Sequence, residues 1–205
     1  IADKITRFYR ERGFILAKAY IPKQEVRDGI VTLTLLLGVL GSVDVNNNEL
    51  YSESTLKSVF DDMLTMPVTN DQVEENLYLI NDFPGVSVNG YFEPGYQVGD
   101  TKLTINVKNE NKYNFNIRLD NHGTDSTGRY RTYADAQVNN LFGNADLLNL
   151  SVLNASEPNN TRYYHVWYET NLFSSKFKAA IGAPRNQFLV SKSQLNAPVG
   201  ITGTV

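Results

Sequence analysis

Cysteine is absent from the 205 residues, and this excludes both a disulfide framework and a metal site with cysteine ligands. Net charge is also small: a formal value of -3 excludes a general binder of polyanions, so nucleic acid is not expected as a partner. No apolar run approaches the ~20 residues that a transmembrane helix needs. Strands of a membrane β-barrel alternate between apolar and polar residues, so a barrel remains compatible with the sequence.

The two parts of the chain carry charge of opposite sign. Residues 1–109 hold ten Lys and Arg against fifteen Asp and Glu, a net of -5, and residues 110–205 hold nine against seven, a net of +2. Tyr and Phe dominate the aromatic content, and Asn is abundant after residue 100. Such strands suit a barrel with an aromatic girdle and a polar lumen, but equally an exposed β-sandwich. The charge asymmetry indicates two regions of different character.

Helical and strand patterns alternate in the first region. Residues 39–109 predict a β-α-α-β-β unit. Its expected elements are a strand over 39–45, a helix from Ser52 to about Leu64, a helix capped by Thr69 or Asn70, and strands over 86–92 and 102–108. Before it, a helix over 3–12 is expected to end at Gly13 and to precede strands over 14–21 and 30–37. That order matches the last three elements of the unit, so we expect a tandem repeat whose first member continues before Ile1.

After Asn109 the pattern changes to strands alone. Tyr113, Phe115, Ile117 and Leu119 alternate with Asn114, Asn116, Arg118 and Asp120. Further strands are predicted over 129–139, 147–154, 162–172 and 176–183, with another beginning at 188–191 and a tight turn over 141–146. These strands have about the ~9–11 residues that a tilted membrane strand requires, whereas strands of soluble sheets average about 5–6. The pattern favours a membrane barrel, with a soluble antiparallel sheet as the alternative.

Several short motifs, taken in order, carry a family resemblance. Residues 9–38 resemble the second half of a POTRA domain from a two-partner secretion transporter, through Tyr9-Arg-Glu-Arg-Gly13, Tyr20-Ile-Pro-Lys-Gln24, Asp28-Gly29 and Leu37-Gly38. Residues 39–109 resemble the next POTRA domain, through Asn81-Asp-Phe-Pro-Gly-Val86, Glu93-Pro-Gly95 and Val98-Gly-Asp-Thr101. Asp120-Asn-His-Gly123, Thr127-Gly-Arg129 and Asn140-Leu-Phe-Gly-Asn-Ala-Asp146 are similar to the opening hairpins of that family's barrel.

The resemblance implies an outer-membrane protein of the hemolysin/hemagglutinin activation-secretion type. Its fold would be α+β POTRA repeats followed by antiparallel transmembrane strands of a sixteen-stranded barrel. The expected domains are the C-terminal part of the first POTRA domain over 1–38, the second POTRA domain over 39–109, and the first barrel strands over 110–205. The family's Arg-Gly-aromatic motif in a loop folded into the pore is absent, so no pore-gating residue can be assigned.

No constellation of residues indicates an enzyme. His122 and His165 have neither Cys nor His nearby, so we expect no metal site. Asp61-Asp62 and Glu74-Glu75 are typical of solvated helix faces rather than paired catalytic carboxylates. The sequence therefore predicts no catalytic residue and no cofactor.

An exposed strand edge is the predicted binding feature of residues 39–109. An edge strand leaves backbone groups unpaired, and an extended client segment can add to it with little demand on sequence. The expected edge is the strand over 86–92, flanked by apolar residues of the second helix. The predicted client-binding residues are Val86, Val88, Gly90, Phe92, Val73, Leu77 and Ile80. For the helix residues, the alternative is that they form the domain core.

Polar residues of the predicted barrel strands would face a hydrated lumen, through which an unfolded chain slides without sticking. The candidates are Asn114, Asn116, Arg118, Arg131 and Gln137. The alternative is that these side chains face solvent on a soluble sheet. Tyr113, Phe115, Tyr164 and Tyr168 would face lipid, with aromatic rings near the membrane interfaces.

The resemblance implies a transporter that catches a large exoprotein, of adhesin or hemolysin type, by its amino-terminal secretion domain in the periplasm. The barrel would then pass the unfolded chain to the cell surface, and outer-membrane lipid would surround it. One alternative is a barrel assembly factor of the same superfamily, and another is a soluble periplasmic scaffold.

Overall fold

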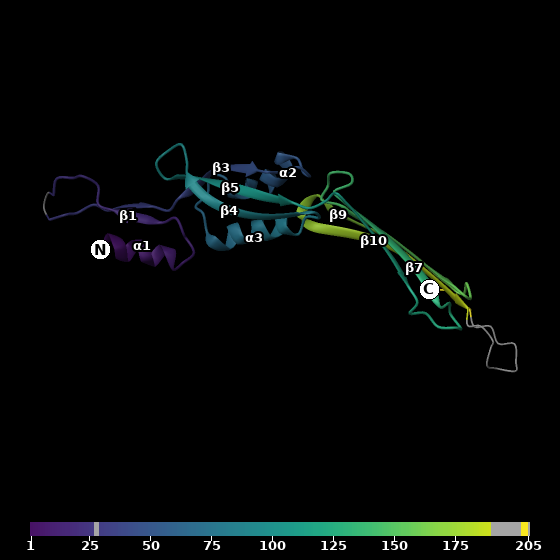
Figure 1. Ribbon diagram of the computed structural model, residues 1–205. Helices are drawn as coiled ribbons and strands as arrows, with labels where there is room; N and C mark the ends of the chain where they lie inside the picture. Colours follow the sequence, from purple (N-terminus) through teal and green to yellow (C-terminus); the bar gives the residue numbers. More distant parts are fainter. Residues whose placement is uncertain (27–28, 190–201, 205) are drawn as a thin grey trace. The chain divides into compact units, whose positions relative to one another are not determined.

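The computed structural model describes residues 1–26, 29–189 and 202–204 of the chain. It divides into two compact units, Ile1–Asn109 and Glu110–Val205 (Figure 1). Helices occur in the first unit, and within the described ranges the second consists of strands and turns. Among the described helices, none has the length and apolar character to cross a membrane.

The first unit begins with α1 (Ala2–Arg10), β1 (Lys18–Tyr20) and β2 (Thr34–Leu36). Gly13 follows the helix with a φ of 90°, in the left-handed region that glycine adopts without strain. Both strands are much shorter than predicted. The N–H groups of Phe14, Ile15 and Ala17 donate to carbonyl groups of the preceding few residues, so this segment is a turn. Local turn bonds therefore override the extended pattern expected over 14–21.

The next elements confirm the predicted β-α-α-β-β order: β3 (Val39–Asn46), α2 (Glu53–Lys57), the 3₁₀ helix η1 (Ser58–Met63), α3 (Asn70–Asn81), β4 (Val86–Pro94) and β5 (Asp100–Asn109). The sheet order is β3-β5-β4, with β3 parallel and β4 antiparallel to the central β5. Its core holds fully buried side chains from the strands, the helices and the segment before α3: Leu40, Leu56, Phe60, Val68, Ile80, Leu103 and Ile105.

The first helix of this sheet unit differs from the prediction. A single α-helix from Ser52 to about Leu64 was expected, but α2 gives way to η1 after five residues. Ser52 caps α2 as expected, since its hydroxyl accepts from the Thr55 N–H at 3.1 Å. The tighter 3₁₀ winding aligns side chains three residues apart, and Phe60 and Met63 are both buried. Packing of these side chains, rather than helical propensity, sets the local geometry.

The second unit is an antiparallel sheet in the order β11-β10-β9-β8-β7-β6. Its strands are β6 (Tyr113–Asp120), β7 (Tyr130–Asn139), β8 (Leu147–Ser156), β9 (Thr161–Leu172), β10 (Ser174–Leu189) and β11 (Thr202–Thr204). The sequence predicted two strands over 176–183 and from 188, but the structure has the single strand β10. It is continuous because its pairing with β9 runs through Pro184 as far as Phe188. Residues 190 and 191, where the last predicted strand ends, lie outside the described ranges.

Buried polar side chains build the turn between β7 and β8, where the sequence predicted a tight turn. Asp146 is fully buried and accepts from the N–H groups of Phe142 at 3.0 Å and Asn144 at 3.3 Å. Asn139 is also fully buried, and its side chain donates to the Asn111 carbonyl group at 3.0 Å. These bonds satisfy polar groups that would otherwise be costly to bury, so the turn is well determined.

Candidate functional site

β4 forms one edge of the three-stranded sheet, because the sheet order is β3-β5-β4. Among the described residues, no strand pairs with β4 on its outer side. Side chains at Val86, Val88, Gly90 and Phe92 alternate with the more exposed Ser87, Asn89 and Tyr91. The first set lies on the face that α3 covers, since a Cβ at Gly90 would stand 3.3 Å from the Leu77 side chain. The predicted edge strand is thus an edge in the structure.

Backbone bonds of Val88 establish which groups of β4 point outward. The Asn81 side-chain oxygen accepts from the Val88 N–H at 2.7 Å, and its amide nitrogen donates to the Val88 carbonyl group at 3.2 Å. In an antiparallel pair, every second residue directs its N–H and C=O groups away from the partner strand. Gly90 and Phe92 therefore direct theirs away from β5, as Val88 does. Val88 was predicted to offer its edge to a client. In the structure those groups are already bonded, and sequence reasoning missed Asn81.

α3 lies beside β4 (Figure 1), but its apolar residues have unequal access to this edge. Val73 and Ile80 are buried in the core, so their side chains are not accessible to a client. For these two residues the core alternative holds, because they fall on the inward face of the helix. Leu77 is half-buried and packs where Gly90 leaves room between the helix and the strand. Leu77 is therefore the one predicted helix residue that borders the edge.

The opposite face of the same sheet is polar. Lys102 on the central strand lies 3.1 Å from a Glu93 carboxylate oxygen and 3.3 Å from one of Asp44, so the three side chains join all three strands. The Thr104 hydroxyl donates to Glu93 at 2.6 Å. The Thr104 hydrogen bond, followed by that from Lys102, lowers the pKa of Glu93. The hydrogen bonds that Lys102 makes to Glu93 and to Asp44 raise the pKa of the Lys102 ammonium group. These groups tie the edge strand to the sheet.

The lowered pKa of Glu93 predicts an acid-dependent loss of stability in the first unit. Its stabilising effect is present above the ordinary glutamate pKa of about 4.3 and is lost as pH falls through the lower, folded-state value. We expect Glu93→Gln to destabilise the unit at pH 7 and to flatten the decline in its urea midpoint toward pH 3. The exposed Asp62 on η1 provides the control, as Asp62→Asn. An unchanged decline in Glu93→Gln would contradict this assignment.

In the second unit, the predicted polar residues share one face of the sheet. Residues 114, 116 and 118 of β6 lie opposite 137, 135 and 133 of β7, and Asp120 lies opposite Arg131. The Arg131 Nε donates to Asp120 at 2.7 Å, and Arg118 lies 3.4 Å from the same carboxylate. The Asn116 amide donates to Asp135 at 3.0 Å. The five predicted lumen residues thus belong to a hydrogen-bonded polar face; that they line a lumen stays a prediction.

An aromatic row on the same face was not predicted. Tyr163 and His165 stack with ring centroids 6.1 Å apart, and Trp167 follows with its centroid 6.3 Å from that of His165. Gly182 on β10 lies opposite Trp167, and a Cβ there would collide with the indole ring. The alternating rings at positions 163, 165 and 167 could have been found in the sequence. That Gly182 lies opposite Trp167 could not, because it depends on the register between β9 and β10.

The reverse face of the second unit is apolar and exposed. Phe115, Ile117 and Leu119 are each more than 70% exposed. The small Ala134 and Ala136 leave a hollow of about 380 Å³, lined by Phe115, Asn116, Ile117, Ala134, Asp135, Ala136, Leu150 and Val152. Exposed apolar surface of this extent is uncommon on a protein in water and marks contact with another apolar phase.

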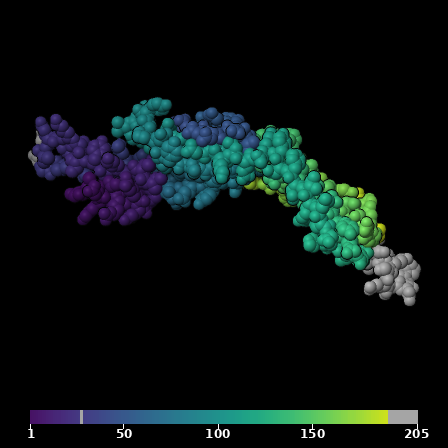
Figure 2. Space-filling model, in the orientation of Figure 1, coloured from purple at the N-terminus to yellow at the C-terminus, as the bar shows by residue number. Residues whose placement is uncertain are grey.

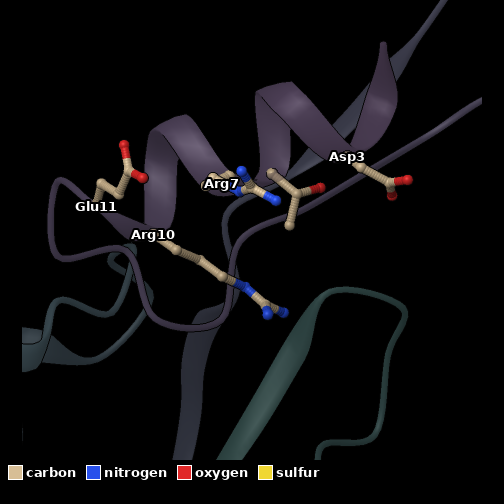
Figure 3. Close-up of a pocket in the computed structure, with 5 residues that line it drawn as sticks. Asp3, Arg7, Arg10 and Glu11 are labelled. Atoms are coloured by element: carbon tan, nitrogen blue, oxygen red, sulfur yellow. The ribbon is translucent and has the colours of Figure 1, made fainter.

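The first unit has two further surface features, a hollow beside α1 and an exposed loop between β4 and β5. A hollow of about 470 Å³ beside α1 is lined by Asp3, Thr6, Arg7, Arg10 and Glu11 (Figure 3). Thr6 bonds to Ala19 of β1 and Arg10 to Ala17 just before it, so this hollow lies where the helix is attached to the following segment. The loop between β4 and β5, drawn in teal, projects from the surface and exposes Tyr96 and Val98 (Figure 2).

Comparison with known proteins agrees with this architecture. The sequence model of the haemolysin secretion/activation protein family ShlB/FhaC/HecB matches residues 99–179, and that of the ShlB-type POTRA domain matches residues 1–38. Heme/hemopexin transporter protein HuxB of Haemophilus influenzae (strain 86-028NP) is 32% identical over 161 residues, which are 78% of this chain and 28% of HuxB. Outer membrane transporter CdiB of Dickeya dadantii is 25% identical over 142 residues, 69% of this chain and 25% of CdiB.

Solved structures show the same fold. CdiB from Escherichia coli has a TM-score of 0.76 at 21% identity, over 96% of this chain and 37% of CdiB. BamA from Haemophilus ducreyi, lacking POTRA domains 1–3, has a TM-score of 0.60 at 13% identity, over 98% of this chain and 38% of BamA. The chain thus spans between 25% and 28% of the curated relatives described above.

These features define a class: an outer-membrane protein with periplasmic POTRA domains and strands of a β-barrel. Within this class, the chain belongs to the haemolysin secretion/activation family ShlB/FhaC/HecB. The family and the fold class predicted from the sequence are confirmed.

Proposed function

We propose that this chain is part of an outer-membrane transporter that recognises a large partner exoprotein in the periplasm and exports it to the cell surface. The names of HuxB and CdiB, both transporters rather than enzymes, support this activity. The alternative of a barrel assembly factor has less support, because BamA shares the fold at only 13% identity. The domains we propose are the end of a first POTRA domain over 1–38, a second over 39–109, and barrel strands over 110–205.

The observation that carries the proposal is the open edge of β4 beside α3. Gly90 and Phe92 direct backbone groups outward from the sheet, whose central strand β5 is paired on both sides. An extended segment that pairs there gains backbone hydrogen bonds, and its alternate side chains reach Leu77. This recognition suits a client that is still unfolded, because it reads backbone rather than a folded surface.

The second unit supports export through its two unlike faces. Its apolar face suits lipid, and its polar face carries Asn114, Asn116, Arg118, Arg131 and Gln137. Ion pairs and amides there are bonded to one another, so a passing chain would meet polar groups that are already satisfied. We propose that this face lines the hydrated path for the client, with the aromatic row of β9 beside it.

A proline at the edge tests capture directly. Phe92→Pro removes an outward N–H without breaking a bond to β5, and proline is tolerated on edge strands. We expect secretion of the partner exoprotein to fall at least about tenfold, because one edge hydrogen bond and the strand geometry beside it are lost. Immunodetection of the exoprotein in the culture medium measures the effect.

The matched control for this proline is Tyr91→Val, on the opposite face of the same strand. It leaves every outward backbone group of β4 in place, so secretion should stay at the wild-type level. Circular dichroism and urea unfolding establish that both variants are folded. Normal secretion by a folded Phe92→Pro protein would contradict capture at this edge.

A further inference from the structure

The open edge of β4 is bounded at both ends, and Asn81 forms one boundary. We propose that the Asn81 side chain is a positioning residue: it occupies the edge at Val88 and confines an added strand to Gly90 through Phe92. This inference rests on the proposed capture of an extended client at β4. It adds the length and the register of the segment that the edge accepts, and it specifies which backbone groups do the pairing.

The Asn81 amide takes the place of a neighbouring strand at one position. An added strand would donate to the Val88 carbonyl group and accept from its N–H, and the Asn81 side chain makes both of these bonds. Asn81 is the last residue of α3 and is flanked by the buried Ile80 and, two residues later, Phe83. The helix end is therefore held in the core, and the amide is presented to the strand from a fixed backbone. A client must break two hydrogen bonds to pair at Val88.

Proline sets the boundary at the other end. Pro94 has the same parity along β4 as Val88, Gly90 and Phe92, because it lies opposite Thr101 in the register with β5. Its backbone would face the open edge, but proline has no N–H to offer there. The chain then turns, with the Gly95 N–H bonded to the Asp100 carbonyl group. Between Val88 and Pro94, a complete set of outward donor and acceptor groups is thus available at Gly90 and Phe92.

In residues 1–38, helix side chains also bond to the backbone in and just before a neighbouring strand, and they do so at more than one residue. The Ala19 N–H of β1 donates to the Thr6 hydroxyl at 2.9 Å, and the Arg10 guanidinium donates to the Ala17 carbonyl group at 3.1 Å. Both side chains come from α1, the helix that precedes the strand, as α3 precedes β4. Helix side chains therefore occupy backbone groups at Ala19 of β1 and at Ala17 just before it. At β4 a helix side chain occupies only the position of Val88, and this difference assigns the docking stretch to residues 39–109.

The boundaries predict the chemistry of the captured segment. Only about three to five extended residues can pair between Val88 and Pro94, given the strand rise of about 3.3 Å. Alternate side chains of that segment face Leu77 on the helix side and Glu93 and Lys102 on the polar side. A short stretch that alternates between apolar and polar residues fits both, and proline at a paired position is excluded.

Amide hydrogen exchange with a defined peptide tests this boundary. The probe is the acetylated and amidated peptide Lys-Thr-Val-Thr-Val-Thr-Lys, added to the full-length transporter in detergent micelles with ¹⁵N-labelled Val, Gly and Phe. The same peptide N-methylated at both valines and all three threonines has no free N–H on either edge of its central stretch and is the blank. In the wild type we expect the plain peptide to slow exchange about tenfold at Gly90 and Phe92 and to leave Val88 unchanged.

Two substitutions of Asn81 separate its roles. In Asn81→Ala, Val88 should exchange about tenfold faster without peptide, and the peptide should then protect Val88 together with Gly90 and Phe92. Asn81→Asp keeps an acceptor for the Val88 N–H but cannot donate to its carbonyl group. Its Val88 N–H should therefore stay slow without peptide. Asn89→Ala, on the polar face of the same strand, is the matched control and should keep the wild-type footprint.

Each remaining outcome overturns a distinct statement. If the peptide protects Val88 in the wild type, the client displaces Asn81, and Asn81 sets no boundary although edge capture stands. If Asn81→Ala leaves the exchange of Val88 unchanged, the amide does not occupy the edge. If the plain peptide protects neither Gly90 nor Phe92 in any variant, capture at β4 is wrong, and the boundary is wrong with it.

Discussion

Deletion of residues 39–109 is expected to abolish secretion of the partner exoprotein while the barrel still inserts into the outer membrane. The deleted segment holds the complete three-stranded sheet and the open edge of β4. Under the proposed function, export depends on capture of the client and on its folding outside. Without the edge, capture has no template of unpaired backbone groups. Exoprotein in the culture medium should fall below detection in an immunoblot.

Insertion of the barrel is the control for this deletion. The second unit forms its own compact structure over Glu110–Val205, and its turn at Asp146 is tied to Asn111 through neighbouring buried residues. The shortened transporter should therefore appear in the outer-membrane fraction with the heat-modifiable mobility of a folded barrel. Undiminished secretion by that protein would refute the docking role of the deleted residues.

Phe60→Ala is expected to destabilise the β-α-α-β-β unit of residues 39–109 by about 3–5 kcal/mol, the usual cost of removing a fully buried phenylalanine. Phe60 is completely inaccessible in η1 and packs in the core with Leu56 and Ile80. A domain of this size has a total stability of only about 4–10 kcal/mol, so a large share would be lost. Urea unfolding and trypsin sensitivity of the first unit measure the change, and secretion should fall with it.

An exposed aromatic residue of the same domain provides the comparison. Tyr78 on α3 is 68% exposed, so Tyr78→Ala should change the free energy of unfolding by no more than about 0.5 kcal/mol. A loss below about 1 kcal/mol in Phe60→Ala would mean that η1 contributes little to the core. Equal losses in the two variants would contradict the burial on which the prediction depends.

Periodicity was sufficient to predict most elements of both units. Helical spacing located α3, and the predicted cap at Thr69 or Asn70 falls where the helix begins. Period-two alternation located β6 and placed its polar residues on one face, because side chains of a strand alternate by geometry alone. It failed where local bonds decided the backbone, as at residues 14–17 and in the 3₁₀ helix at Phe60. There, turn bonds and core packing outweighed the apolar pattern.

The candidate site was predicted only in part, for a similar reason. The sequence predicted that Val73, Leu77 and Ile80 share one apolar face of the helix. It could not tell which of them are buried in the core and which lies beside the edge of β4. The division depends on where β4 crosses α3, and Gly90 leaves room for Leu77 alone. Asn81 had no signal of its own beyond lying at the end of a helix. Its two bonds to Val88 exist because the turn at Phe83–Gly85 returns the chain beside the helix end.

By itself the sequence determined the class of the protein: POTRA-type repeats, long alternating strands and a junction near Asn109 where charge changes sign. These properties are local, since propensity, alternation and turn residues act within a few positions of the chain. The tertiary structure alone decided which backbone groups of β4 are open, which helix residues are buried, and how Asp120, Arg131 and the aromatic row meet across strands. Such contacts join residues distant in sequence, and only the register of a folded sheet brings them together.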